Sequence, residues 1–164
     1  MQRIIWHWTA GTYSVSALDR QHYHFVIDGE GHYYDAVPIE NNVPPLVSGK
    51  YAAHTLGSNS GSIGISCAAM AGARETGNYG SFPLLQRQID TLITLSVALC
   101  HYYEIPVSPK TTLSHAEVQT NLGIQQRGKW DIAVFPFDLC FNTAKKCGDY
   151  IRAKVQEGLN VHIL

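Results

Sequence analysis

The sequence has little charge and no excess of either sign. Asp, Glu, Lys and Arg make up 15% of its 164 residues, and the formal net charge is −1. Nucleic-acid-binding domains usually carry a basic face, so we expect no nucleic-acid partner. A hydrophobic content of 45% at this length suits one core and is short for two. No internal repeat or linker is visible, and we therefore expect one domain over residues 1–164.

The sequence also lacks paired cysteines and long apolar runs. Its four cysteines form no CxxC pair and no dense framework, which indicates free thiols in a reducing compartment. The longest apolar segment, residues 92–99, is interrupted by Thr94 and Ser96 and is far shorter than the roughly 20 residues of a membrane helix. No basic segment followed by an apolar run stands at the start. We expect a protein made in the cytoplasm without a signal peptide and without membrane insertion.

Alternating and helical patterns predict the elements that are present. Residues 3–9 are β-branched and aromatic and predict a strand with His7 near its end. Residues 62–69 alternate larger with small side chains, which is typical of a buried central strand. Residues 23–27 and 32–36 flank a glycine-rich turn and predict a hairpin. Helices are predicted at residues 16–21, 83–103 and 143–157. These elements indicate an α/β fold with a mixed central sheet flanked by helices.

Two segments predict irregular structure. Residues 37–56 contain three prolines and should form a surface connection, with His54 at its end. Residues 113–136 contain His115, Lys129 and Asp131, while their apolar residues are too scattered for a core. Glycines interrupt this stretch, so a helix or strand along it is not expected. Long irregular segments inside a domain are often functional, and we interpret this one as an active-site loop.

Three widely separated side chains have the donor atoms of a catalytic zinc site. His7, His115 and Asp131 offer two imidazole nitrogens and a carboxylate oxygen, which leaves a fourth position for water. Spacing alone leaves this open, because eight histidines in a chain of this length produce many apparent triplets. A Cys67–His115 nucleophile is a further scheme, but Cys67 lies in the strand that the pattern predicts to be buried.

Four blocks of sequence occur in the order found in a known family. They resemble the zinc-dependent N-acetylmuramoyl-L-alanine amidases of type 2, which include phage lysozyme-type amidases and peptidoglycan recognition proteins. The blocks are IIWHWTAG at residues 4–11, YHFVIDGEG at 23–31, AAHTLGSNSGSIGISC at 52–67, and LSHAEV with GKWD at 113–118 and 128–131.

The resemblance implies a function and a role for each matching residue. It implies hydrolysis of the amide between N-acetylmuramic acid and L-alanine in bacterial peptidoglycan, by a zinc-activated water in a cleft at one edge of the sheet. Lys129 would stabilise the oxyanion, and Tyr23 would orient the water or help its proton transfer. His54 would line the substrate site. The zinc ion would be held by His7, His115 and Asp131.

Two positions depart from parts of the family. Recycling amidases have a glutamate in the SIGIE block as a candidate base, whereas this sequence has Ser66. That role therefore does not transfer, and Tyr23 carries more of it. The interval between His115 and Asp131 is also longer than in the shortest phage enzymes. The extra residues 120–127 form either a flap over the substrate or a longer loop.

The resemblance leaves the biological setting open among three cases. We expect a monomeric phage or prophage endolysin that reaches the cell wall after release. One alternative is a non-catalytic peptidoglycan recognition module, which shares the fold but typically lacks a full ligand set. The other is a cytosolic amidase that recycles anhydro-muropeptides.

Overall fold

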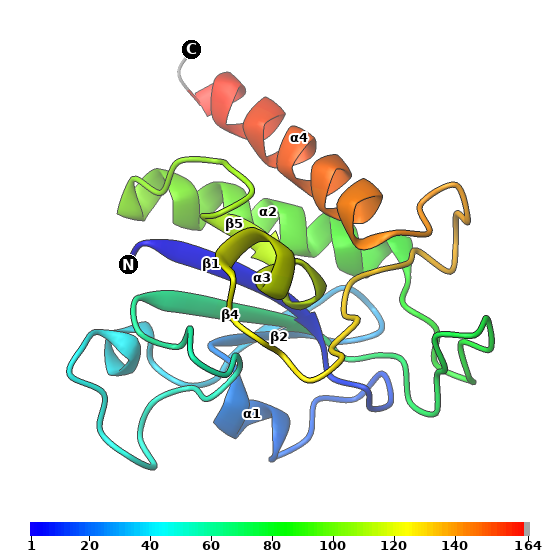
Figure 1. The fold of residues 1–164 in the computed structure, drawn as a ribbon, viewed down its shortest axis with the longest axis horizontal. Coiled ribbons are helices and arrows are strands. Elements are labelled where there is room, and N and C mark those ends of the chain that lie inside the picture. Colours follow the sequence, from blue (N-terminus) through cyan, green and yellow to red (C-terminus); the bar gives the residue numbers. More distant parts are fainter. Residues whose placement is uncertain (163–164) are drawn as a thin grey trace.

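Strand β1 (Arg3–Trp8) lies inside a five-stranded sheet and runs parallel to both of its neighbours, β4 (Ser62–Cys67) and β5 (Thr112–Ser114). The computed structural model describes residues 1–162 (Figure 1). Beyond β4 lies β2 (Phe25–Ile27), also parallel, and the edge strand β3 (Tyr33–Asp35) is antiparallel to β2. The order β3-β2-β4-β1-β5 makes a mixed sheet, as the sequence predicted.

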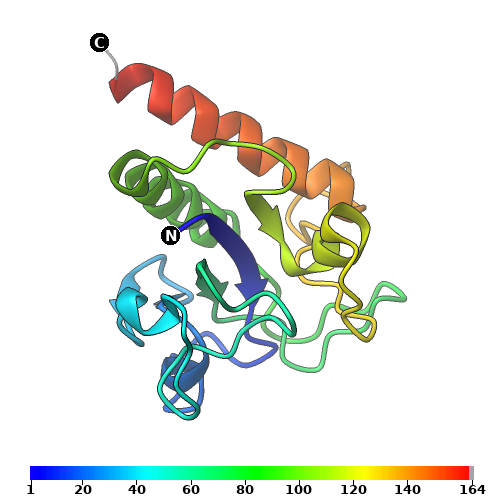
Figure 2. The same ribbon diagram turned by 60° about the vertical axis from the view of Figure 1, so that its left-hand side comes forward.

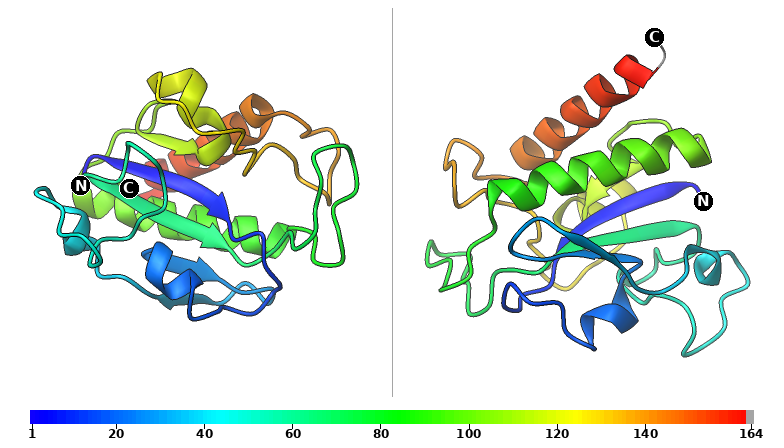
Figure 3. Two further views of the ribbon diagram at one scale, coloured as in Figure 1. Left: turned by 60° about the horizontal axis from the view of Figure 1, so that its bottom comes forward. Right: turned by 180° about the vertical axis from the view of Figure 1, so that it is seen from behind.

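One face of the sheet packs against the two long helices, α2 (Gln86–Tyr103) and α4 (Ala144–His162). Successive side chains of a strand point to opposite faces. Trp6 of β1 points to the helical face, where its indole N–H donates to Ser96 Oγ at 2.9 Å. Both helices lie on the same side of the sheet in Figure 1 and, from behind, in Figure 3.

The opposite face carries the shorter helices and the long loops. Helix α3 (His115–Leu122) packs Val118 against Ile5 of β1 and Leu113 of β5, and these three residues form a small second core. Helix α1 (Asp19–His22) lies against β2. Figure 2 shows α3 on one flank of β1 with α1 below the sheet. Because His7 shares this face with Ile5, the fold turns its imidazole away from the main core.

The expectation that residues 113–136 contain no helix or strand was wrong for their first part. Strand β5 ends at Ser114, and α3 begins at the next residue. A capping box starts this helix: the Ser114 N–H donates to Glu117 Oε1 at 3.0 Å. Gly123, at φ 73°, ends it. Both signals are visible in the sequence, but eight residues are too few to show a clear helical stripe. From Gly123 to Pro136 the chain is irregular, as expected.

The other element predictions hold with shifted bounds. The hairpin, the buried strand and the two long helices are confirmed, although α4 continues beyond residue 157 to His162. The first helix is shorter than predicted, and the connection at 37–56 contains a 3-10 turn (Ile39–Asn42). No helix within residues 1–162 has the length and apolar character that a membrane crossing requires.

Candidate functional site

The site begins at the carboxyl end of β1. His7 pairs in register with Ser66 of β4, and its side chain is fully buried. The left view of Figure 3 shows β1 and β4 running side by side in the same direction. The ends of parallel strands open towards the loops that follow them, which is where α/β folds form their sites.

His7, His115 and Asp131 converge on one point, although up to 124 positions of sequence separate them. His7 Nδ1 lies 3.1 Å from His115 Nδ1 and 3.2 Å from Asp131 Oδ2. His115 Nδ1 lies 3.5 Å from the same oxygen. The three donor atoms lie within 4.8 Å of one another, and all three residues are buried. Strand β1, the first residue of α3 and the loop after it thus each contribute one donor.

The remaining nitrogen of His115 is held by Gln126. His115 Nε2 lies 2.7 Å from Gln126 Oε1, and Gln126 Nε2 donates to the Leu56 carbonyl at 2.7 Å. A carbonyl oxygen only accepts hydrogen bonds, so His115 Nε2 carries the ring proton. The lone pair of His115 Nδ1 therefore points towards Asp131 and His7.

The remaining nitrogen of His7 faces His54. His54 Nε2 lies 3.2 Å from the Ser62 carbonyl, which accepts its proton and leaves His54 Nδ1 as an acceptor. That Nδ1 lies 3.1 Å from His7 Nε2, and Thr55 Oγ1 lies 3.5 Å from the same nitrogen. His7 Nε2 is thus the donor, and His7 Nδ1 presents a lone pair to the cluster. His54 is 7% exposed and both lines the cleft and braces His7.

Burial and charge set the protonation states of this cluster. Burial lowers the pKa of His7 to about 4, although the hydrogen bond to Asp131 opposes the shift. Burial alone would raise the pKa of Asp131, but the imidazoles of His115 and His7, which donate to the carboxylate whenever Nδ1 carries a proton, outweigh burial and bring the pKa to about 2. At neutral pH the cluster therefore contains an uncharged His7 and an ionised carboxylate. These are the states in which imidazole and carboxylate bind a metal.

The donor set fits a zinc ion. Three lone pairs that meet in a buried space repel one another, and a cation between them removes the repulsion. Two imidazoles with one carboxylate are a common catalytic zinc set, and each imidazole here has a second partner that fixes its orientation. The charges and tautomers of these side chains thus agree with a divalent ion bound by His7, His115 and Asp131.

The cluster lies in a cleft of about 830 Å³. Tyr23 and Lys129 line this cleft. The Tyr23 ring centroid lies 5.2 Å from that of His7. Trp8 and Trp130 meet edge to face at 4.6 Å and form part of the wall. Lys129 is exposed, and its charge contributes to the lowered pKa of His7.

Tyr23 stays protonated at neutral pH. Burial raises the pKa of its phenol, and the Asp131 carboxylate raises it further, while Ser66 acts in the opposite direction. Ser66 is buried, and its hydroxyl makes no hydrogen bond of ordinary geometry within residues 1–162. Because residue 66 is a serine, this position offers no carboxylate base. Its hydroxyl is a free polar group beside the phenol.

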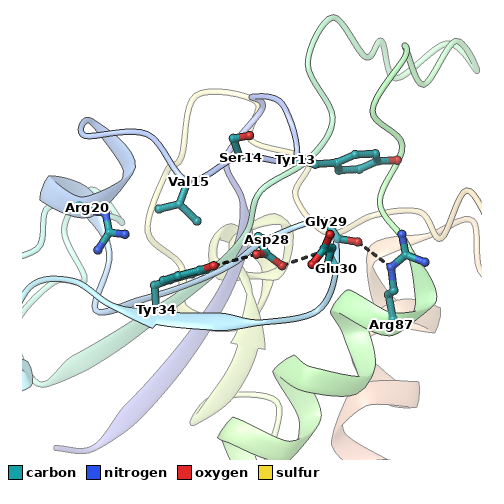
Figure 4. Close-up of a pocket in the computed structure, with 9 residues that line it drawn as sticks. All are labelled: Tyr13, Ser14, Val15, Arg20, Asp28, Gly29, Glu30, Tyr34 and Arg87. Atoms are coloured by element: carbon teal, nitrogen blue, oxygen red, sulfur yellow. Dashed lines mark hydrogen bonds between the residues drawn. The ribbon is translucent and has the colours of Figure 1, made fainter.

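A second hollow lies away from the cluster, between residues 13–15 and the turn of the hairpin (Figure 4). Several of its polar groups are engaged with one another. The Tyr34 hydroxyl donates to Asp28 Oδ2 at 3.1 Å, and Asp28 Oδ1 accepts the N–H groups of Glu30 and His32. Arg87 Nε donates to the Gly29 carbonyl at 2.6 Å. These bonds brace the turn, and we assign no ligand to this hollow.

Sequence reasoning missed Gln126 and the bracing position of His54. Gln126 lies in the extra segment at residues 120–127, for which a flap or a longer loop was expected. The structure places its side chain, 4% exposed, against His115. No local pattern distinguishes it from its neighbour Gln125, because its partner Leu56 is 70 positions away.

Comparison with solved structures shows the same fold in known amidases. The N-acetylmuramoyl-L-alanine amidase LysC of Clostridium intestinale URNW aligns with a TM-score of 0.54 and 20% identity, over 94% of this chain and 85% of that chain. The endolysin amidase LysCS of the same organism aligns with a TM-score of 0.55 and 20% identity, over 94% and 83%. AmiD of E. coli aligns with a TM-score of 0.51 and 20% identity, over 71% of this chain and 48% of its own.

The sequence comparisons address the family directly. No curated protein matches the chain. The family model described as N-acetylmuramoyl-L-alanine amidase matches residues 1–131, which is most of the chain and ends at Asp131. With the mixed sheet and the cluster at its edge, this match shows that the chain belongs to the N-acetylmuramoyl-L-alanine amidase family of amide hydrolases.

Proposed function

We propose that this chain hydrolyses the amide between N-acetylmuramic acid and L-alanine in peptidoglycan, with a zinc ion held by His7, His115 and Asp131. The observation that carries the proposal is the convergence of three buried donors within 4.8 Å at the wall of an 830 Å³ cleft. Their tautomers and charges are those that a divalent ion needs. A bound zinc ion supplies a Lewis acid that activates water at neutral pH and polarises a carbonyl.

Two residues of the cleft act on the reacting groups in this proposal. Lys129 places a cation at the rim, where it stabilises the negative charge that develops on the carbonyl oxygen. Tyr23, with its raised pKa, acts as a hydrogen-bond donor that orients the attacking water or the substrate carbonyl. Because its raised pKa keeps the phenol protonated, Tyr23 is suited to orientation and not to proton removal.

The proposed substrate is the junction between a sugar and its stem peptide. The E. coli AmiD structure contains anhydro-N-acetylmuramic acid-L-Ala-D-γ-Glu-L-Lys, and we propose a ligand of the same class for this cleft. Trp8 and Trp130 at the wall offer apolar faces for the sugar, while His54 and Lys129 offer polar contacts to the peptide.

Zinc content and cleavage products test the proposal together. The purified wild type should bind about one zinc ion per chain and release stem peptides with a free L-alanine amine from cell wall, as seen by mass spectrometry. Asp131→Ala should lose both properties, because it removes one of three protein ligands. Asp90→Ala changes an exposed aspartate on α2 and is the control. Normal zinc and activity in Asp131→Ala would refute the ligand assignment.

The biological setting is a finer proposal, and the substrate decides it. We propose a monomeric endolysin that acts on intact wall after release. Cleavage of whole sacculi should then exceed cleavage of soluble anhydro-fragments. Exclusive action on the fragments would instead identify a recycling enzyme. Zinc and wall binding without any cleavage would identify a recognition module.

A further inference from the structure

We propose that Gln126 is a positioning residue that holds His115 in the tautomer able to bind a metal through Nδ1. The inference rests on the proposed metal site and extends it to the segment at residues 120–127. This segment then contributes a support for one ligand, in addition to forming part of the cleft wall.

The Gln126 side chain is fixed at both ends of its amide. Its Oε1 lies 2.7 Å from His115 Nε2, and its Nε2 donates to the Leu56 carbonyl at 2.7 Å. Its backbone N–H donates to Gln119 Oε1 on α3 at 3.1 Å. With an exposure of 4%, the amide has little access to solvent that would replace these partners.

The Leu56 carbonyl determines which way the amide points. This carbonyl is an acceptor, so the Gln126 NH₂ group must face it and the Gln126 oxygen must face His115. That oxygen is an acceptor too, so the His115 proton lies on Nε2. His115 Nε2 thus donates to Gln126 Oε1, and Gln126 Nε2 donates to the Leu56 carbonyl.

The fixed Gln126 amide disfavours the opposite tautomer. A bare His115 Nε2 would face the lone pairs of Gln126 Oε1 at 2.7 Å in a buried site. The proton of that tautomer would lie on Nδ1, 3.5 Å from Asp131 Oδ2, where it bonds the carboxylate and occupies the lone pair that a metal needs. Gln126 removes this competing state before a metal arrives. Loss of such an outer partner typically weakens metal binding 10- to 100-fold.

Two substitutions separate this role from simple support of the loop. Gln126→Met has a similar length but neither accepts from His115 nor donates to Leu56. Gln126→Glu keeps an oxygen against His115 Nε2, replaces the donor to Leu56 by a second oxygen, and adds a negative charge that favours the Nε2–H form. If Gln126 acts through the tautomer, the glutamate retains the function; if it only ties the loop to Leu56, the glutamate fails as the methionine does. Gln125→Met changes the exposed neighbour and is the matched control.

The zinc dissociation constant, measured by chelator competition, is the first readout. We expect Gln126→Met to bind zinc roughly 10- to 100-fold more weakly than the wild type. Gln126→Glu and Gln125→Met should bind it about as tightly as the wild type. Wild-type affinity in Gln126→Met, or equal losses in the Met and Glu variants, would overturn the inference.

The tautomer of His115 in the metal-free protein is the second readout, and it needs no active enzyme. Long-range nitrogen-15 NMR should show the Nε2–H form in the wild type and in Gln126→Glu, and a mixture in Gln126→Met. An Nδ1–H form in the metal-free wild type would overturn the inference even if the methionine variant failed to fold. A wild type that bound no zinc but showed the Nε2–H form would refute the proposed metal site and leave the positioning role of Gln126 supported.

Discussion

At the scale of single residues, burial and neighbouring groups together select the protonation states of Asp131, His7 and His115. The carboxylate stays ionised with a pKa of about 2 because His115 and His7 lie within hydrogen-bonding distance. His7 stays neutral because burial disfavours its charged form and lowers its pKa to about 4. Each imidazole keeps one nitrogen for the cluster and gives the other to a fixed partner. The metal-binding state is therefore prepared by the protein.

Lys129→Ala tests the electrostatic role at the cleft. The substitution removes an exposed cation that we place near the developing oxyanion, while the three ligand candidates remain. We expect kcat to fall about 10²- to 10³-fold, as for loss of one oxyanion donor. Zinc content should be unchanged. Lys110→Ala, which changes an exposed lysine before β5, is the control. An unaltered kcat in Lys129→Ala would show that Lys129 has no role in the reaction.

His24 tests how a buried histidine couples stability to pH. Burial lowers its pKa to about 4 from an ordinary 6.5, and its Nδ1 accepts the Gly64 N–H at 2.9 Å. In acid the unfolded chain binds the proton more readily than the folded chain. Stability is therefore complete above pH 6.5 and falls as the pH drops towards 4, by about 2 kcal/mol at pH 5 from this residue.

Urea unfolding of metal-free protein at pH 7 and pH 5 measures that loss. His7 and His54 act in the same direction, so the comparison is with His24→Gln, which has no group that titrates there. The wild type should lose more unfolding free energy on acidification than the variant. Equal losses in the two proteins would contradict the assignment.

At the scale of elements, α3 is stabilised by residues that lie outside it in the sequence. Glu117 in its first turn accepts from Ser114 and also pairs with Arg152 of α4 at 2.7 Å. Arg152 donates to the Thr112 carbonyl of β5 as well. Both charged side chains are buried. One ion pair thus joins α4 to the helix whose first residue is His115.

Arg152→Met tests this connection between elements. It leaves the Glu117 carboxylate buried without its cation, which typically costs about 3–5 kcal/mol. Urea unfolding of metal-free protein measures the loss. Lys145→Met removes the exposed pair with Asp149 on the same helix and should cost about 1 kcal/mol or less. Adding Glu117→Gln to Arg152→Met should recover part of the lost stability. An Arg152→Met protein as stable as the wild type would contradict this role of the ion pair.

At the scale of the whole molecule, the core extends beyond the part that matches the family. The family model ends at Asp131, yet α4 follows it and packs against α2. Cys147, Ile151 and Val155 of α4 are fully buried in the main core. The ligand candidates lie within the matched part, but the fold that positions them includes α4.

Truncation after Asn142 tests this dependence. The shortened chain keeps every ligand candidate but loses the buried Cys147 and the Arg152 ion pair, together with Ile151 and Val155, each of which typically contributes about 1.5–3 kcal/mol. A domain is stable by only about 5–15 kcal/mol, so we expect no cooperative thermal transition by circular dichroism. Truncation after Asn160 keeps these contacts and is the control. A sharp transition in the shorter chain would show that α4 is dispensable.

The sequence alone determined the elements with long, regular patterns and the types of residue at the site. Strands β1 and β4 and the two long helices were predicted because alternation and helical spacing are local properties of the chain. The ordered motifs predicted the three ligand candidates, Tyr23 and Lys129, because those blocks lie within short segments. The mixed sheet and the family followed from the same information.

Only the tertiary structure decided how the ligand candidates are supported. Helix α3 takes Arg152 from 35 positions away as a partner, so a prediction from its own eight residues missed it. Gln126 is fixed by a backbone carbonyl 70 positions away, and His54 reaches His7 across 47 positions. These are contacts between atoms that the chain brings together only when the whole sheet and its loops have formed. Local patterns contain no trace of these contacts. The ligand candidates could therefore be predicted from short motifs, whereas the residues that support them could not.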